Sequence, residues 1–190
     1  MSILKNEIPI LEFDTEKNAV INPTHEMLDI KLPSKCVFAF LEDYIEEYAT
    51  KNDLKQVAHF ISATKKYPIY RMEYKGREVV LCQAPVGAAS ATQMLDWLIG
   101  YGVREIISAG SCGCLEEFSE GTFLVPYKAL RDEGTSYHYA PPSRFMERLH
   151  LLCWLHCFHN LYLYISVSAL CSPFSPVMPD LQHWDKLASL

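Results

Sequence analysis

A short glycine-bracketed stretch, Gly110-Ser111-Cys112-Gly113, combines the groups that a small polar ligand needs. Glycine adopts backbone conformations with positive φ and lets a ligand approach the main chain closely. Successive exposed N–H groups, together with the hydroxyl of Ser111, form a site for an anion or a hydroxyl group. A tight structural turn has the same composition, so the stretch alone predicts a site without naming its ligand.

A second candidate is Gly87, which precedes a predicted helix beginning at Ala88. The N-terminus of a helix offers free N–H groups and the positive end of the helix dipole, and both suit phosphate. The surrounding PVGAAS sequence has neither the P-loop spacing nor the dinucleotide-binding spacing. A plain strand-to-helix turn therefore remains the alternative.

A third polar stretch, residues 131–139, follows a predicted buried strand. Loops in such places often carry functional side chains, although a solvated loop has the same composition. No Ser/His/Asp or Cys/His triad can be assigned from spacing, so the catalytic residues stay unassigned. The cysteines and histidines between Cys153 and His159 lack a standard zinc spacing, and no metal is expected.

These three stretches lie within a sequence that alternates between predicted strands and predicted helices. Short apolar runs predict strands, and a stripe of apolar residues over 88–99 predicts an amphipathic helix. The predicted strands are 36–40, 57–62, 69–74, 78–83, 105–109 and 122–125, and the predicted helices are 41–49 and 88–99. Lys75-Gly76 is expected to turn a hairpin, whereas 110–113 is expected to be a loop. Ligands bind at the carboxyl ends of strands in βαβ sheets, where both glycine stretches would lie.

Composition excludes several classes of protein. The chain has 190 residues with 49% hydrophobic and 21% charged, which suits one soluble domain or one domain with an appendage. The net charge of −6 and the absence of a basic run argue against nucleic-acid binding. The odd count of seven cysteines and an N-terminus without a signal-peptide pattern predict free thiols and a cytoplasmic location.

The composition changes near residue 150. Only three of the forty charged residues lie in 151–190, and residues 149–171 contain no Asp, Glu, Lys or Arg. That length would span a bilayer, but three histidines within it raise the cost of insertion and argue against a membrane span. We therefore divide the chain into a partial domain, 1–148, and a divergent apolar tail, 149–190, whose fold is not predicted.

The stretch from Gly76 to Pro141 resembles the nucleoside phosphorylase family, which includes uridine phosphorylase and the hexameric bacterial purine nucleoside phosphorylases. The resemblance is carried by GREVVLCQAPVGAASATQMLDWLIGYGVREIISAGSCG and by EGTFLVPYKALRDEGTSYHYAPPS. These are similar to the family's G-I-G helix entry, its G-[ST]-[CT]-G loop and its G-D-L-V-[IV]-x-x-x-A-x-R-x-x-G strand and loop. The resemblance implies an α/β fold, a mixed β-sheet with flanking helices, incomplete at its C-terminal end.

The resemblance also implies a reaction. Family members cleave the N-glycosidic bond of a nucleoside with inorganic phosphate as co-substrate and no cofactor, giving free base and ribose 1-phosphate. By position, Ser111 would contact phosphate or ribose, Cys112 and Gly113 would line the base, and Gly87 would face phosphate. Whether a purine or a pyrimidine is preferred is not indicated.

Several positions depart from the family pattern. Ser108 stands where the family has an arginine, three residues before the loop hydroxyl. The family's first-strand loop, Gly-Asp-x-x-Arg, corresponds to 41–45, which has no arginine and ends in Ile45. A third arginine, supplied in the family by the neighbouring subunit, matches Lys65 and implies a homo-oligomer, a dimer or an assembly of dimers into a hexamer. No glutamate follows Glu147, so the family's C-terminal ribose-binding glutamate has no counterpart.

Three functions therefore stay open. The first is a truncated protein of the nucleoside phosphorylase family that is catalytically impaired or inactive, and the second is a nucleosidase-like hydrolase of the same fold. The third is a non-catalytic nucleoside-binding or regulatory subunit that pairs with an intact paralogue.

Overall fold

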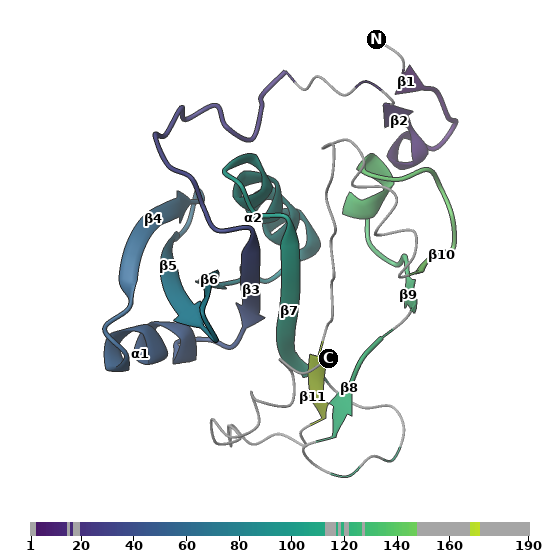
Figure 1. Ribbon diagram of the computed structural model, residues 1–190. Helices are drawn as coiled ribbons and strands as arrows, with labels where there is room; N and C mark the ends of the chain where they lie inside the picture. Colours follow the sequence, from purple (N-terminus) through teal and green to yellow (C-terminus); the bar gives the residue numbers. More distant parts are fainter. Residues whose placement is uncertain are drawn as a thin grey trace.

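The computed structural model describes residues 3–14, 16, 20–112, 117, 119, 122–126, 128–147 and 168–171. Its main body is a seven-stranded mixed sheet in the order β4-β5-β6-β3-β7-β11-β8 (Figure 1). The strands of this sheet are β3 Lys35–Phe40, β4 Lys55–Ile61, β5 Lys66–Tyr74, β6 Arg77–Gln83, β7 Glu105–Cys112, β8 Phe123–Leu124 and β11 Ser168–Cys171. Strands β6, β3, β7 and β11 are parallel to one another, whereas β5 and β8 run antiparallel to their neighbours.

Two α-helices cover opposite faces of the sheet. Helix α2, Ala88–Gly100, connects β6 to β7, and helix α1, Tyr44–Lys51, connects β3 to β4. Because neighbouring residues of a strand point to opposite faces, Phe38 packs towards α2 whereas Ala39 packs towards α1. The fold class predicted from the sequence is confirmed, with a mixed sheet between flanking helices.

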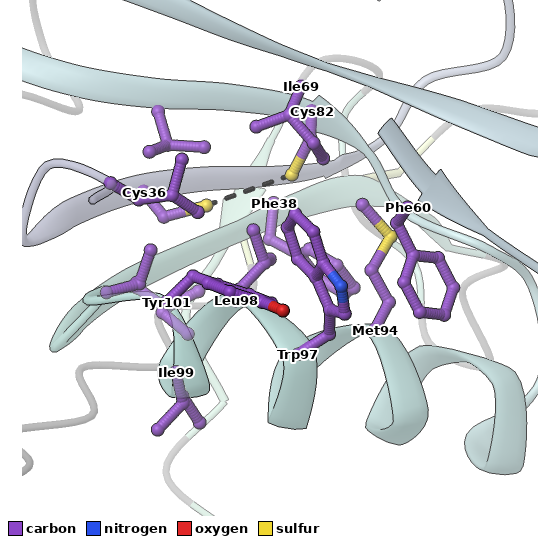
Figure 2. Close-up of a cluster of buried hydrophobic side chains, with 14 of the residues drawn as sticks. Cys36, Phe38, Phe60, Ile69, Cys82, Met94, Trp97, Leu98, Ile99 and Tyr101 are labelled. Carbon is purple, nitrogen blue, oxygen red and sulfur yellow. Dashed lines mark hydrogen bonds between the residues drawn. The ribbon is translucent and has the colours of Figure 1, made fainter. Parts of the chain in front are cut away.

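The larger core lies under α2. Figure 2 shows side chains of α2 and the strands packed together there, among them Met94, Trp97, Phe60 and the cysteine pair Cys36 and Cys82. The ring of Trp97 lies 6.0 Å from that of Phe60 in an edge-on arrangement. These buried aromatic and aliphatic side chains fix α2 on the sheet and therefore fix the direction of the turn that precedes it.

The segment before β3 forms a strap over the C-terminal half of α2. The indole N–H of Trp97 donates to a carboxylate oxygen of Glu26 at 2.9 Å, and the Leu28 N–H donates to the Tyr101 hydroxyl at 3.3 Å. The Leu32 N–H also donates to the Tyr101 carbonyl at 2.8 Å. Nothing in the local sequence pattern predicts this strap, which depends on contacts across the fold.

The remaining elements are short and lie outside the main sheet. They form two antiparallel strand pairs, and one 3-10 helix lies in the chain between the two strands of each pair. Figure 1 shows these elements grouped on the side of the molecule away from β4 and β5. These elements are β1 Ile3–Leu4, η1 Pro9–Leu11, β2 Phe13–Asp14, β9 Lys128–Leu130, η2 Thr135–His138 and β10 Phe145–Glu147.

Most local predictions are confirmed. The hairpin turns at Lys75 and Gly76, whose φ angles of +48° and +72° suit the mirror-image turns of hairpins. Helix α1 begins at Tyr44 rather than at the predicted Leu41, because Glu42 has a left-handed backbone with φ of +50°. A residue in that conformation interrupts a right-handed helix.

The predicted end of the strand at residues 105–109 is wrong. Residues 105–109 were expected as a strand and 110–113 as a loop, but β7 continues through Cys112. Residues Ala109 to Cys112 pair in parallel register with Ser168 to Cys171 of β11, which supplies the hydrogen bonds that extend the strand. Gly113 lies outside the described residues.

The division at residue 148 stays a prediction. Of the segment 149–190, the structure describes only residues 168–171, which form β11 within the main sheet. In the described part of the chain, no helix is long and apolar enough to cross a membrane.

Candidate functional site

Three neighbouring parallel strands end at the same edge of the sheet. Gln83 of β6, Ala39 of β3 and Ala109 of β7 are register partners in one row across the sheet. The chain then leaves β6 towards Gly87 and leaves β3 towards Glu42, while β7 continues to Cys112. We call this the carboxyl edge, and it brings the two predicted glycine stretches to one side of the molecule.

Gly87 forms the turn between β6 and α2, as predicted. Its φ of +101° and ψ of 136° belong to a conformation that only glycine adopts readily, and a Cβ there would have no atom within 4 Å. The residues from Val86 to Ser90 are exposed, and the first turn of α2 holds no acidic residue. The free N–H groups of this turn are therefore accessible to an anion.

The end of β7 holds the other predicted residues. Ser111 is exposed and Cys112 is partly buried. The strand pleat assigns Ser111 to the α1 face and Cys112 to the α2 face, where Gly87 begins the helix. Packing is tight at Gly110, because a Cβ there would lie 3.1 Å from the Cβ of Phe40, its partner on β3.

Lys65 also lies at the carboxyl edge, in the turn between β4 and β5. Its Nζ is 3.9 Å from a carboxylate oxygen of Glu46 and 5.5 Å from the centre of the Tyr67 ring. Strands β6 and β3 separate β5 from β7, which corresponds to roughly 14 Å of sheet width. A single chain therefore does not bring Lys65 next to Ser111.

The two positions where the sequence lacks an expected arginine are buried. Ile45 is 2% exposed and packs with Ala39 and Leu81, and Ser108 is 5% exposed on β7. The turn between β3 and α1 instead exposes Glu42 and Asp43 at this edge. The local charge of that turn is therefore negative, and it weakens rather than strengthens attraction for an anion.

The polar stretch 131–139 is organised around a buried arginine that sequence analysis did not single out. Arg131, 6% exposed, donates to the carbonyls of Pro141 and Ala140 at 2.6 and 3.0 Å, and to the hydroxyls of Ser136 and Ser143 at 3.0 and 2.9 Å. Its guanidinium also lies 4.3 Å from the centre of the Tyr137 ring. These contacts hold residues 131–143 together as one segment. In the sequence, Arg131 was marked only as the arginine of the family-like strand motif.

Glu133 caps the 3-10 helix η2 within the same segment. Its carboxylate accepts the Thr135 N–H at 2.7 Å and the Ser136 N–H at 3.0 Å. Burial by itself raises the pKa of Glu133, but the hydrogen bonds from Ser136 and Thr135 and the charge of Arg131 outweigh it and leave the pKa below its usual value. The loop predicted from the sequence is thus an ordered segment with a charged cap.

Among the described residues, no group of three or more His, Cys, Asp or Glu side chains is arranged to hold a metal ion. The cysteines and histidines of 153–159 lie outside the described residues. The chemical groups described at the carboxyl edge include backbone N–H groups, a hydroxyl, a thiol, carboxylates and the ammonium group of Lys65.

Comparison with known proteins identifies the family to which this chain belongs. The family profile of the Phosphorylase superfamily matches residues 35–161, which include β3, β6, α2 and β7. A guanosine phosphorylase of Halorubrum lacusprofundi is 30% identical over 88 residues, covering 46% of this chain and 36% of that protein. A uridine phosphorylase of Escherichia coli is 26% identical over 102 residues, covering 52% of this chain and 38% of its own length.

The fold is also similar to solved structures. A uridine phosphorylase of Vibrio fischeri superposes with a TM-score of 0.53 at 18% identity, covering 84% of this chain and 67% of that one. A second structure of the Vibrio fischeri enzyme, in complex with 6-hydroxy-1-naphthoic acid, gives a TM-score of 0.51 at 19% identity over 83% of this chain. The matches to the two curated relatives span little more than a third of those proteins.

Proposed function

The chain belongs to the Phosphorylase superfamily, and from that premise we propose that its carboxyl edge binds a nucleoside and phosphate and cleaves the N-glycosidic bond by phosphorolysis. The observation that carries the proposal is that the Gly87 turn and the end of β7 lie at the same carboxyl edge of the sheet, on either side of β3. The products would be a free base and ribose 1-phosphate. The similar proteins include guanosine and uridine phosphorylases, so both purine and pyrimidine nucleosides are candidate substrates.

Each residue has a proposed role in this reaction. Gly87 and the first-turn N–H groups of α2 would hold phosphate, and Ser111 would contact phosphate or ribose. Cys112 and Gly113 would line the base. A phosphate oxygen forms the new bond to the anomeric carbon while the C–N bond breaks, and the base leaves with that electron pair and takes up a proton. Fixed N–H dipoles lower the barrier by orienting phosphate before the bond forms.

Phosphate binding is proposed to be weak. The arginine positions of the family pattern are Ser108 and a buried Ile45, and Lys65, the lysine that the resemblance assigns to phosphate, is already paired with Glu46. Lysine keeps the positive charge but lacks the two-pronged geometry with which arginine holds phosphate. We therefore expect saturation only at high phosphate concentration.

Hydrolysis is the second candidate. The exposed carboxylates of Glu42 and Asp43 lie at the edge where phosphate would approach, and they favour a neutral nucleophile. Water would then attack the anomeric carbon, giving free base and ribose. The acidic turn is the observation that favours this function over phosphorolysis.

A base-release assay separates these functions. Purified full-length chain is incubated with guanosine, inosine or uridine, with and without inorganic phosphate, and both the base and the sugar product are measured. Phosphate-dependent release of base with ribose 1-phosphate supports phosphorolysis. Release of ribose without phosphate supports hydrolysis, and nucleoside binding without turnover supports a non-catalytic subunit and contradicts both.

Lys65 is proposed to act on the site of a second copy in a homo-oligomer, because its own Ser111 lies too far away across the sheet. We expect Lys65→Met to raise the phosphate KM, while Lys66→Met, which removes the neighbouring charge, leaves it unchanged. Mixing Lys65→Met with Ser111→Ala protein should restore part of the activity, since one site in a mixed dimer keeps both groups. Equal activity of the separate and mixed variants would contradict a shared site.

A further inference from the structure

We propose that Gln83 is a positioning residue of the carboxyl edge, which it organises by holding the backbone of Glu42. This inference rests on the proposed function. With its amide oriented so that both ends are satisfied, the side-chain nitrogen of Gln83 donates to the Glu42 carbonyl at 2.7 Å. Its side-chain oxygen accepts the Glu42 N–H at 3.2 Å. The two hydrogen bonds form a clamp between the end of β6 and the turn that follows β3.

The clamp adds side-chain hydrogen bonds beyond the last backbone hydrogen bonds between β3 and β6. Backbone pairing between β3 and β6 reaches the row of Ala39 and Gln83, and the Ala84 N–H then donates to the Ala39 carbonyl at 2.7 Å. Beyond this point the two chains diverge towards α1 and α2. A carboxamide carries the same kinds of donor and acceptor as a peptide group, so the Gln83 side chain pairs with the main chain of Glu42, three residues beyond Ala39.

The clamped residue needs such support. Glu42 has a φ of +50°, a left-handed conformation that disfavours residues with a Cβ. The turn around it contains one further backbone hydrogen bond, from the Tyr44 N–H to the Leu41 carbonyl at 3.2 Å. Asp43, which precedes α1, makes no side-chain cap on the helix. The carboxamide of Gln83 therefore supplies both hydrogen bonds of the Glu42 main chain within the described structure.

The position of Gln83 links two turns of the site. Its own chain runs through Ala84 and Pro85 to Gly87, whereas its side chain holds the turn that exposes Glu42 and Asp43. A change in the clamp alters the distance between those carboxylates and the N-terminus of α2. Because catalysis and anion binding are sensitive to displacements of about 1 Å, this distance sets how strongly phosphate is bound.

Gln83→Met tests the clamp, since methionine keeps the length and volume of the side chain without its hydrogen bonds. Gln56→Met on the edge strand β4 is the matched control, because Gln56 is exposed and its side-chain partner is His59. Hydrogen exchange of the Glu42 amide, followed by NMR on the full chain, should accelerate about tenfold or more in Gln83→Met. It should not change in Gln56→Met, and unchanged exchange in Gln83→Met would overturn the clamp.

The functional arm uses inorganic phosphate and uridine or guanosine as probes. We expect Gln83→Met to change the apparent phosphate KM about tenfold, with kcat and the nucleoside KM within about twofold of wild type. Gln83→Glu, which keeps the acceptor for the Glu42 N–H but loses the donor, should give an intermediate exchange rate. Faster exchange with an unchanged phosphate KM would make Gln83 purely structural and overturn the positioning role.

Failure of the proposed function is distinguishable from failure of the clamp. If wild-type protein neither releases base nor binds nucleoside in calorimetry, there is no site for Gln83 to position, and both proposals fall. Slow exchange of the Glu42 amide in that protein would show that the clamp exists without a site beside it. Thermal unfolding of each variant, compared with wild type, identifies any loss that comes from unfolding alone.

Discussion

The hydroxyl of Tyr139 donates a hydrogen bond of 2.6 Å to a carboxylate oxygen of Asp96, and so joins the segment after η2 to helix α2. Burial raises the pKa of Asp96, although the hydrogen bond from Tyr139 opposes this shift. Burial also raises the pKa of Tyr139, and the hydrogen bond to Asp96 and the charge of its carboxylate raise it further. The pair therefore depends on a neutral phenol beside a carboxylate.

Replacing Tyr139 by Phe should lower the free energy of unfolding by about 1 kcal/mol at pH 7, because a partly buried carboxylate loses its donor. The raised pKa of Tyr139 means that its contribution is complete below the unfolded value near pH 10 and is lost as pH rises through the folded value. The difference between wild type and Tyr139→Phe in urea unfolding should therefore shrink above pH 10. Equal stability of the two proteins at pH 7 would contradict the pairing.

Asp96→Asn provides the complementary test, because asparagine still accepts the hydrogen bond but carries no charge. A carboxyl group whose folded pKa is raised stabilises the fold at low pH, and this contribution is lost as pH rises through the folded value. Wild type should therefore gain stability relative to Asp96→Asn as the pH is lowered from 7 to 3. A pH-independent difference between the two unfolding curves would be inconsistent with a buried carboxylate.

Glu133→Gln should cost about 1 kcal/mol at pH 7, because the charged cap of η2 is replaced by a neutral one. The lowered pKa of Glu133 gives a contribution that is complete above the unfolded value, near pH 4.3, and is lost as pH falls through the folded value. The difference in unfolding free energy should thus vanish in strong acid. Asp132→Asn, at the exposed neighbouring position, serves as the control and should change little at either pH.

Gly87→Ala should separate backbone strain from ligand binding. At both Gly87 and Gly76 the φ is positive, +101° and +72°, and an added Cβ would meet nothing within 4 Å. Each substitution should therefore destabilise the fold by about 1 to 3 kcal/mol through strain. Only Gly87→Ala should also weaken phosphate binding in calorimetry, and an equal effect of Gly76→Ala, in the distant hairpin turn, would show that the loss is not local.

Thiol labelling should distinguish the core cysteines from the one at the carboxyl edge. Cys36 and Cys82 are buried with their Sγ atoms 3.8 Å apart (Figure 2), and burial together with the hydrogen bond between the two thiols raises the pKa of the Cys36 thiol. Cys112 is partly exposed. Peptide mapping after brief iodoacetamide treatment should find Cys112 alkylated at least about tenfold faster than either core thiol, and this contrast should disappear in urea.

The parts of the fold that the sequence predicts are those with local signals. The apolar run of β3, the stripe on α2 and the Lys75-Gly76 turn each depend on residues close together in the chain, and all three are confirmed. The extension of β7 through Cys112 was missed because it depends on pairing with β11, far along the chain. Periodicity carries no information about such a partner.

The site was predicted only in part for the same reason. The glycine at position 87 was found because a strand-to-helix turn has a local signature, and its edge of the sheet follows from the βαβ order. The Gln83 clamp and the network of Arg131 join residues whose spacing has no periodic pattern, and each requires a particular backbone trace. The phosphate-binding role of Gly87 and the roles of Ser111, Cys112, Gly113 and Lys65 stay predictions until ligands are measured.

The insertion of β11 between β7 and β8 has a consequence for how the protein is made. On the ribosome, β7 is synthesised before residues 168–171, so its outer edge lacks this partner while the residues between the two strands are added. Open strand edges attract other strands, and nascent chains bearing them are prone to aggregate. The half of the carboxyl edge that carries Ser111 is thus completed last, and chaperones that shield unpaired strands should raise the yield of native protein more than those that shield helices.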